Sequence, residues 1–259
     1  MTQPRDSQHD LVVQQFGPRA AAYASSPTHA AGPDLAAFQA ILRAAPVGSL
    51  LDLGCGGGHA SFHAAPHAGE VVAYDLSADM LGTVATGAAA RGLTNIRTQQ
   101  GRAEQVPFTD DHFDMVASRY SAHHWRQVPV ALAEAARVLR PGGRLVMMDV
   151  LAPADPLLDS FLQTVEMVRD PSHVRDYSLS EWRDMLSAAG MTPQGPAETY
   201  RLRLEFQPWV DRIGSPESHR PALRSLLAGA AAEVKQHFAV EADGSFTIDT
   251  MLMVAVKES

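Results

Sequence analysis

A glycine-rich turn that follows a short apolar segment constrains this chain more than any other feature. Residues 49–59 read Ser-Leu-Leu-Asp-Leu-Gly-Cys-Gly-Gly-Gly-His, and the apolar positions within 47–53 predict a buried strand that ends next to Asp52. An alanine-rich segment with helical character comes directly after the turn. Because glycine has no side chain, a strand–turn–helix unit of this kind lets a ligand approach the backbone closely.

The spacing of acids and glycines indicates what kind of ligand the turn holds. Asp75 ends a second apolar strand, 70–75, about twenty residues further on, where a carboxylate that binds ribose hydroxyls is expected. A dinucleotide site has the pattern Gly-x-Gly-x-x-Gly. Here Gly58 comes one residue too early, and His59 occupies the dinucleotide position. An NAD-dependent oxidoreductase is therefore the less favoured alternative.

Apolar strands alternate with helical segments from Val47 onward, which predicts an α/β fold with a parallel sheet covered by helices on both faces. We expect strands at residues 47–53, 70–75, 95–100, 113–118 and 143–150. We expect the helices between them at residues 59–67, 78–91 and 128–139.

The two ends of the chain do not follow this alternation. Helices are predicted at 11–24, 33–45, 155–169 and 178–189, and a long helical segment at 208–238 with an interruption at 214–216. Strands are predicted at 199–206 and 245–257. We interpret 1–259 as a single domain. It consists of an N-terminal helical cap (1–46), a core that carries the glycine turn (47–150), and lid insertions with the C-terminal strands (151–259).

The glycine turn resembles the first motif of the class I S-adenosylmethionine (SAM) dependent methyltransferases. That motif reads acid-x-Gly-x-Gly-x-Gly, and Asp52, Gly54, Gly56 and Gly58 match it position by position. The resemblance implies a Rossmann-like, seven-stranded, mostly parallel sheet with one antiparallel strand near an edge, N-terminal helices and helical lid insertions. It also implies SAM as the cofactor and S-adenosylhomocysteine as its product.

The cofactor is a sulfonium with an ammonium and a carboxylate, and its net positive charge suits a pocket that holds two acids. Asp75 is expected to accept hydrogen bonds from both ribose hydroxyls. With the resemblance, the sequence predicts the following cofactor-binding residues: Asp52, Gly54, Cys55, Gly56, Gly58, Asp75, Leu76, Met80, Ala103, Glu104, Ser118, Tyr23 and Arg19.

Several of these positions also have simpler interpretations. Arg19 and Tyr23 form either a donor pair near the methionine carboxylate or an exposed arginine beside a packed tyrosine. Leu76 and Met80 would sandwich the adenine, but core packing selects the same residue types. Cys55 is interpreted as a small side chain in the turn rather than a nucleophile, because no base is evident nearby. Arg102 stands where relatives usually carry an acid, and arginine cannot accept from the adenine amino group.

A second stretch indicates the class of acceptor. Phe113-Asp114, Ser118 and the pair His123-His124 resemble the subgroup related to ubiquinone and menaquinone C-methyltransferases. The Asn/Asp-Pro-Pro-Tyr signature of enzymes that methylate amino groups of DNA and protein is absent. We therefore expect C- or O-methylation of a small molecule, with quinone-like rings among the acceptors. His123 and His124 are the candidates for removing an acceptor proton; alternatively, one stacks on Trp125 and the other is exposed.

Composition excludes several other functions. The formal net charge of −8 argues against nucleic acid as the main partner. The single cysteine excludes an internal disulfide and a cysteine-rich zinc site. His59, His63 and His67 recur every fourth residue, but Pro66 disturbs the last turn and no acid or cysteine completes a ligand set. We therefore expect no metal.

The remaining expectations concern location and assembly. Residues 1–10 are polar, so we expect no signal peptide, and no run is long enough to span a bilayer. A cytoplasmic protein that is a monomer or a homodimer is the interpretation. An alternative of another class is a non-catalytic partner subunit with a methyltransferase fold, but the intact glycines and Asp75 argue against it.

Overall fold

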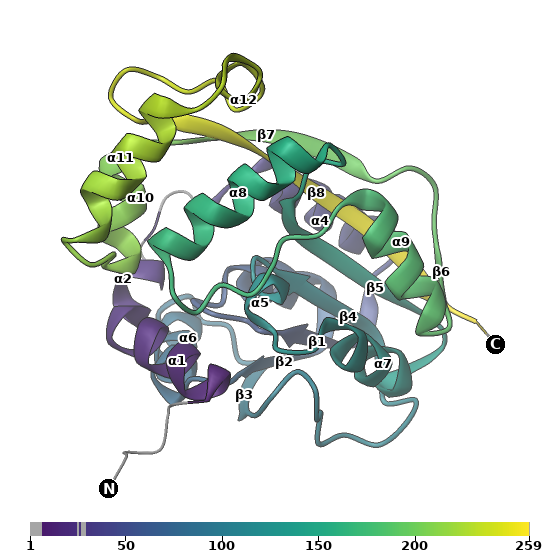
Figure 1. Ribbon diagram of the computed structural model, residues 1–259. Coiled ribbons are helices and arrows are strands. Elements are labelled where there is room, and N and C mark those ends of the chain that lie inside the picture. The colour runs from purple at the N-terminus through teal and green to yellow at the C-terminus, as the bar shows by residue number, and fades with distance from the viewer. Residues whose placement is uncertain (1–6, 25, 27–29, 259) are drawn as a thin grey trace, which may run out of the picture.

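The computed structural model of the protein describes residues 7–24, 26 and 30–258, and within them eight strands form one sheet (Figure 1). The order is β3-β2-β1-β4-β5-β8-β6, and β7 also pairs with β8. The neighbouring strands from β3 to β5 pair in parallel, whereas β8 is antiparallel to each of its partners. The strands are β1 Val47–Leu53, β2 Ala68–Asp75, β3 Ile96–Gln100, β4 Phe113–Arg119, β5 Leu139–Leu151, β6 Met191–Pro193, β7 Glu198–Leu204 and β8 Phe246–Lys257.

The predicted Rossmann-like sheet and its single antiparallel strand are confirmed, but the number of strands differs from the prediction. Both β6 and β7 pair with the edge of β8 that faces away from β5. They fill one position of a seven-position sheet, and the stretch 194–197, which contains Gly195 and Pro196, separates them. Gly195 has a φ of 62° and proline cannot donate a ladder hydrogen bond, so the strand is interrupted there.

Helices cover both faces of the sheet, as expected from the alternating pattern. The helices before β5 are α1 Gln8–Phe16, η1 Gly17–Arg19, α2 Ala20–Ala24, α4 Pro33–Ala44, α5 His59–Ala64, η2 Ala65–His67, α6 Ala78–Ala90, η3 Ala122–His124 and α7 Val128–Val138. Those after β5 are α8 Pro156–Arg169, α9 Leu179–Ala188, α10 Phe206–Ile213, α11 His219–Gly229 and α12 Ala232–His237.

The predicted interruption of the helical segment 208–238 is present: α10 ends where Gly214 adopts a left-handed φ of 66°, and α11 and α12 follow. Two other predicted boundaries were wrong for local reasons. Phe206, predicted as the last residue of a strand, is the first residue of α10 and is buried beneath it. The fifth strand begins at Leu139, before the Pro-Gly-Gly bend, because Leu139 already pairs with Phe113.

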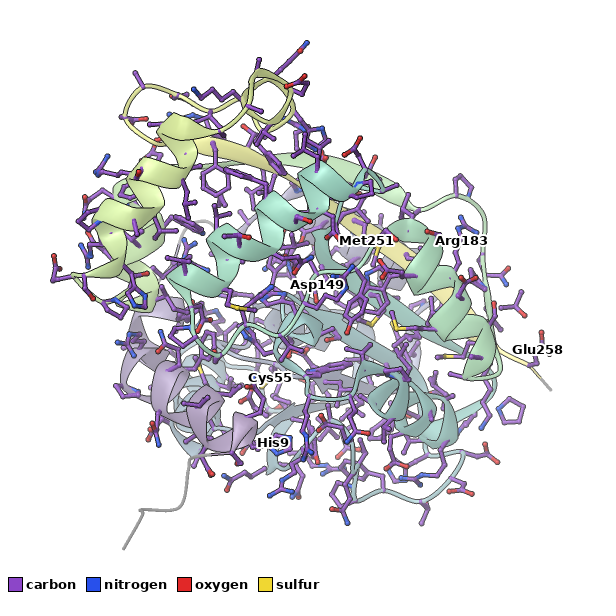
Figure 2. The ribbon with its side chains drawn as sticks, viewed as in Figure 1. His9, Cys55, Asp149, Arg183, Met251 and Glu258 are labelled. Carbon is purple, nitrogen blue, oxygen red and sulfur yellow. The ribbon has the colours of Figure 1, made fainter. Side chains whose placement is uncertain are left out.

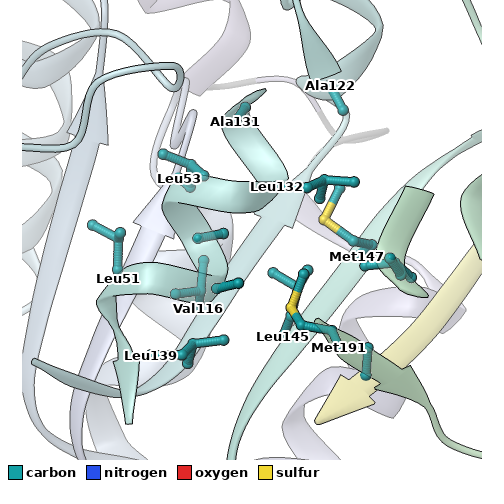
Figure 3. Close-up of a cluster of buried hydrophobic side chains, with 14 of the residues drawn as sticks. Leu51, Leu53, Val116, Ala122, Ala131, Leu132, Leu139, Leu145, Met147 and Met191 are labelled. Atoms are coloured by element: carbon teal, nitrogen blue, oxygen red, sulfur yellow. The ribbon is translucent and has the colours of Figure 1, made fainter. Parts of the chain in front are cut away.

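Alternate residues of each strand point into different layers of the core. Leu51, Val116 and Leu145 pack against α7 and α9, and Figure 3 shows them with Leu132 of α7. Leu50, Met115 and Val146 belong instead to the layer formed with α4 and α5. The helices contribute Leu35, Phe38, Leu42, Ala60 and Ala64 to it. A further cluster joins α8, α10, α11 and α12 to the ends of β7 and β8. The sheet is thereby fixed from both sides, and the carboxyl ends of its parallel strands meet at one edge.

Parts of the sequence-based interpretation fall outside the described residues. The expectation about a signal peptide rests on residues 1–10, of which 1–6 are not described. None of the helices in the described ranges is long and apolar enough to cross a membrane.

Phe38 tests the layer that holds α4 against the sheet. Its side chain is 0% exposed among leucines and methionines, so Phe38→Ala should lower the free energy of unfolding by about 3–5 kcal/mol. Leu157→Ala on α8, where the side chain is 53% exposed, is the matched control and should change it by less than about 0.5 kcal/mol. Urea denaturation measures both; equal effects would contradict the assignment of this layer.

Candidate functional site

A cleft lies at the carboxyl ends of β1, β2 and β4, the place where open α/β sheets bind their ligands. It encloses about 1000 Å³, part of which is open to solvent. The glycine turn after β1 forms its floor, and His9, Val12 and Phe16 of α1 line it from the N-terminal side. Figure 1 shows α1 and α2 beside α6, so that the beginning of the chain covers the loops that follow the strands.

The glycine turn is held by the neighbouring strand. The amides of Gly54 and Cys55 donate to the Tyr74 carbonyl at 2.8 and 3.0 Å. Gly54, Gly56 and Gly58 have φ values of 75°, 48° and 84°, which side chains rarely tolerate. A Cβ on Gly54 would lie 1.9 Å from the Ser121 hydroxyl, whereas one on Gly56 would meet nothing within 4 Å. Gly54 is thus required for packing, and Gly56 exposes its backbone to the open cleft.

Asp75 ties the turn to the next strand. Its carboxylate accepts from the Gly56 amide at 2.8 Å and from the Ser77 amide at 2.9 Å. Burial raises the pKa of this carboxyl, and the hydrogen bonds from the two amides act in the opposite direction. The carboxylate lines the cleft beside Leu76, in the orientation that those amides impose.

Asp52 is the buried acid of the cleft. One carboxylate oxygen accepts from the Ser61 hydroxyl at 2.6 Å, while Oδ1 is buried without a hydrogen-bond partner among the described residues. Burial raises the pKa of Asp52 to about 6. A buried carboxylate oxygen that lacks a donor is unfavourable unless a ligand supplies one. The unpartnered acceptor Oδ1 therefore fits a ligand with a cationic group that donates a hydrogen bond.

The loop after β3 forms the opposite wall of the cleft. The Tyr74 hydroxyl, which the sequence interpretation missed, donates to the carbonyls of Arg102 and Gln105 at 3.0 and 3.1 Å and so fixes the turn that carries Ala103 and Glu104. Arg102 lines the cleft but its side chain is exposed. Leu76 and the buried Met80 also line the cleft, so it offers apolar surface against which a flat ring could pack.

The structure brings most of the predicted cofactor residues together in this cleft: Asp52, Gly54, Cys55, Gly56, Asp75, Leu76, Met80, Ala103, Glu104 and Tyr23 all line it. Gly58, Ser118 and Arg19 do not. A Cβ on Gly58 would collide with Val84, so this glycine serves packing, and Ser118 is fully buried in β4.

The position of Arg19 was not indicated by the sequence, whereas Cys55 agrees with its interpretation as a small buried side chain in the turn. The Arg19 guanidinium donates to the Gln15 carbonyl at 2.6 Å and packs against Gly214, away from the cleft. Burial raises the pKa of the Cys55 thiol well above its usual range, which disfavours the reactive thiolate.

A second cavity adjoins the cleft and has a volume of about 610 Å³, part of which is open to solvent. Both spaces are lined by Phe16, Tyr23, Tyr120 and His124, which we call the shared wall. Within it the Phe16 ring lies 5.3 Å from the Tyr23 ring and 4.8 Å from the His124 ring, measured between centroids. Most of the remaining surface of the second cavity comes from residues after β5. The apolar residues of this surface are Val150, Leu202, Leu204, Trp209, Ile213 and Ile248, and the polar and charged ones are His123, Glu166, Arg169, His173, Asp176 and Arg212.

The predicted catalytic histidines stand in different environments. His124 belongs to the shared wall, and His123 lines only the second cavity. Their rings lie 4.2 Å apart and both are half-buried, so the interpretation with one exposed histidine does not describe them. Nδ1 of His123 lies 2.6 Å from the carboxylate of Asp149, near the end of β5.

The two histidines also differ in their pKa. Burial alone would lower the pKa of His123, but the Asp149 carboxylate outweighs it and raises the pKa to about 9. Burial and the neighbouring His123 lower the pKa of His124 to about 4. The sequence interpretation did not include Asp149 among the site residues. Its only signal was the position of an acid close to the end of an apolar strand.

Comparison with known proteins identifies the family. A model of the methyltransferase domain matches residues 51–147. YafE of Escherichia coli K12, an uncharacterized protein, is 48% identical over 200 residues, which are 77% of this chain and 96% of YafE. YcgJ of Bacillus subtilis, an uncharacterized methyltransferase, is 34% identical over 247 residues, 93% of this chain and 97% of YcgJ. Its crystal structure superposes with a TM-score of 0.81 and covers 86% of this chain and 99% of that one.

A more distant relative is a quinone methyltransferase. A 2-phytyl-1,4-naphtoquinone methyltransferase of Synechococcus elongatus is 36% identical over 126 residues, 46% of this chain and 53% of that protein. Fold, glycine turn and relatives agree: the chain belongs to the class I methyltransferases, the family whose methyl donor is SAM.

Asp52 gives a pH-dependent prediction for the ligand-free protein. Its pKa is about 6 in the folded state, against about 3.9 for an aspartate in an unfolded chain. The folded state therefore keeps a proton that the unfolded state loses, so the stabilising contribution is complete below about pH 4 and is lost as the pH rises through 6. At pH 8, Asp52→Asn should raise the free energy of unfolding by up to about 3 kcal/mol.

Urea denaturation between pH 4 and 8 measures this effect, and the difference from wild type should vanish near pH 4. Ser61→Ala is the companion variant: it removes the hydroxyl that favours the charged carboxylate, so it should steepen the loss of stability above pH 6. A destabilised Asp52→Asn variant at pH 8 would contradict the assignment.

Proposed function

We propose that the protein transfers a methyl group from SAM, held in the cleft, to a small-molecule acceptor held in the second cavity. One observation carries this proposal: the cleft with the glycine turn and two acids adjoins a second cavity, lined by apolar and charged side chains, across the shared wall. A donor and an acceptor that occupy the two spaces would meet at that wall.

Each part of the cleft suits a different part of the cofactor. Asp75, oriented by the Gly56 and Ser77 amides, would accept from the ribose hydroxyls. The unpartnered Oδ1 of Asp52 would accept from the ammonium group. Leu76 and Met80 would pack against the adenine, with the turn of Ala103 and Glu104 on its other side. When bound, SAM supplies a methyl group that its sulfonium already activates.

The contribution of the chain to catalysis is then mainly alignment in a space that excludes water. The aromatic side chains of the shared wall and α1 would shield the reacting groups from solvent. His124 contacts both spaces and is the histidine placed to touch the reacting group of the acceptor, whereas His123 is held by Asp149.

The apolar residues that line part of the second cavity, Leu202, Leu204 and Trp209 among them, support a small organic acceptor, and the charged residues beside them would contact its polar groups. The similarity to a naphthoquinone methyltransferase adds support for a quinone-like ring and for C- or O-methylation. Because the insertions between β5 and β8 line most of this cavity, they would determine which acceptor fits.

Calorimetric titration with SAM, S-adenosylhomocysteine and NAD tests the assignment of the cleft. We expect the first two to bind and NAD not to bind. Asp75→Ala should weaken SAM binding at least tenfold, because the hydroxyls lose a charged acceptor worth about 1.5–3 kcal/mol. Glu70→Ala, at the opposite end of β2, is the matched control and should bind SAM as wild type does.

Unchanged SAM affinity in Asp75→Ala, or binding of NAD without SAM, would contradict the proposed site. Formation of S-adenosylhomocysteine upon addition of reduced naphthoquinones and phenols then tests transfer itself. A chain that binds SAM but gives no product with any acceptor would instead support the non-catalytic partner subunit.

A further inference from the structure

A cluster of one histidine and two aspartates lies beside the second cavity. It consists of His123 from η3, Asp149 from β5 and Asp176 from the segment between α8 and α9, which we call the His–Asp–Asp cluster. One potential ligand atom from each residue lies within 4.8 Å of the others. Figure 2 shows Asp149 near the centre of the molecule, below α8, so the cluster is an interior feature.

Asp176 is the member of this cluster whose environment is incomplete. Its side chain is 1% exposed, and neither carboxylate oxygen has a hydrogen-bond partner in the described part of the chain. The nearest cationic candidates are Nδ1 of His123 and Nε2 of His173, each 3.9 Å away. Since Asp149 is also buried, two carboxylates face one histidine in the interior. Burial of charge costs several kcal/mol unless it is compensated, so an ionised Asp176 carboxylate requires a cation in contact with its unpartnered oxygens.

The donor atoms match a particular class of ion. An imidazole nitrogen with two carboxylate oxygens is a ligand set for divalent transition metals such as Zn²⁺ and Mn²⁺, whereas Mg²⁺ and Ca²⁺ prefer oxygen alone. Three protein ligands leave coordination positions open. His123 and Asp176 line the second cavity, so an open position would be accessible from it.

The surroundings hold the three side chains in place. The second oxygen of Asp149 accepts from the Ala122 amide at 3.0 Å. The Asp176 amide donates to the side-chain oxygen of Gln163 at 3.0 Å, which positions the segment that carries the carboxylate. Outer contacts of this kind orient the ligands in metal sites.

We propose that His123, Asp149 and Asp176 bind one divalent transition-metal ion of the Zn²⁺ or Mn²⁺ class beside the second cavity. The ion would take the place of the proton that His123 shares with Asp149. Its positive charge would compensate the negative charge of the Asp176 carboxylate. No metal was expected from the sequence, because no acid or cysteine completes the set of His59, His63 and His67. The ligands proposed here come from separate elements, and His123 and Asp149 alone are 26 residues apart. The proposal that the protein binds this ion does not depend on the proposed function. A role of the ion in contacting an oxygen of the methyl acceptor would depend on it.

Calorimetric titration of EDTA-treated, desalted full-length protein with ZnCl₂ and with MnCl₂, in the absence of SAM, tests the proposal. We expect one saturable equivalent of at least one of these ions in the wild type. Asp176→Asn should weaken that binding at least tenfold. Asp170→Asn is the matched control, because Asp170 is equally buried, has an unpartnered oxygen and lies beside His124 but outside the cluster.

No stoichiometric binding of either ion to the wild type would overturn the proposal, and this result stands even if Asp176→Asn does not fold. Equal binding in Asp176→Asn and wild type, or an equal loss in Asp170→Asn, would also overturn it. Titration of the same preparations with SAM separates the two proposals. Metal binding without SAM binding would support the metal site and contradict the assignment of the cleft to SAM. SAM binding without metal binding would support the assignment of the cleft and contradict the metal site.

Discussion

The two hydrogen bonds that the Asp75 carboxylate accepts organise the functional edge of this protein. One comes from Gly56 and joins the glycine turn after β1 to the end of β2; the other comes from Ser77 and sets the start of α6. The turn can pass this close to the strand because Gly54 and Gly56 accept left-handed backbone angles. The open floor of the cleft and the direction of α6 both depend on this arrangement.

Segments far apart in the sequence complete the site. Phe16 and Tyr23 come from the N-terminal helices, and Tyr120 and His124 follow β4. The Gln15 side chain donates to the Ile213 carbonyl at 2.7 Å, so α1 is joined to α10 at the boundary between the two spaces. Because this wall depends on elements that are far apart in the chain, the separation of the cleft from the second cavity is a property of the whole fold.

Much of the fold and part of the site could be predicted from local sequence patterns, but contacts between distant segments could not. The glycine turn, Asp75 and the alternation of strands and helices are short-range signals, and the parallel sheet follows from them. The direction of Arg19 depends on Gly214, and the pairing of His123 with Asp149 and Asp176 depends on three separate elements. No local spacing encodes such contacts. The interruption between β6 and β7 was missed because three residues are too short for a periodic signal.

The central claim is that the cleft and the second cavity hold donor and acceptor separately. A crystal structure of the protein with S-adenosylhomocysteine tests it most directly. The account predicts the ribose at Asp75, the amino group at Asp52 and the sulfur directed toward the wall formed by Phe16, Tyr23, Tyr120 and His124, with the second cavity free of this ligand. S-adenosylhomocysteine in the second cavity, or bound without contact to either acid, would contradict it.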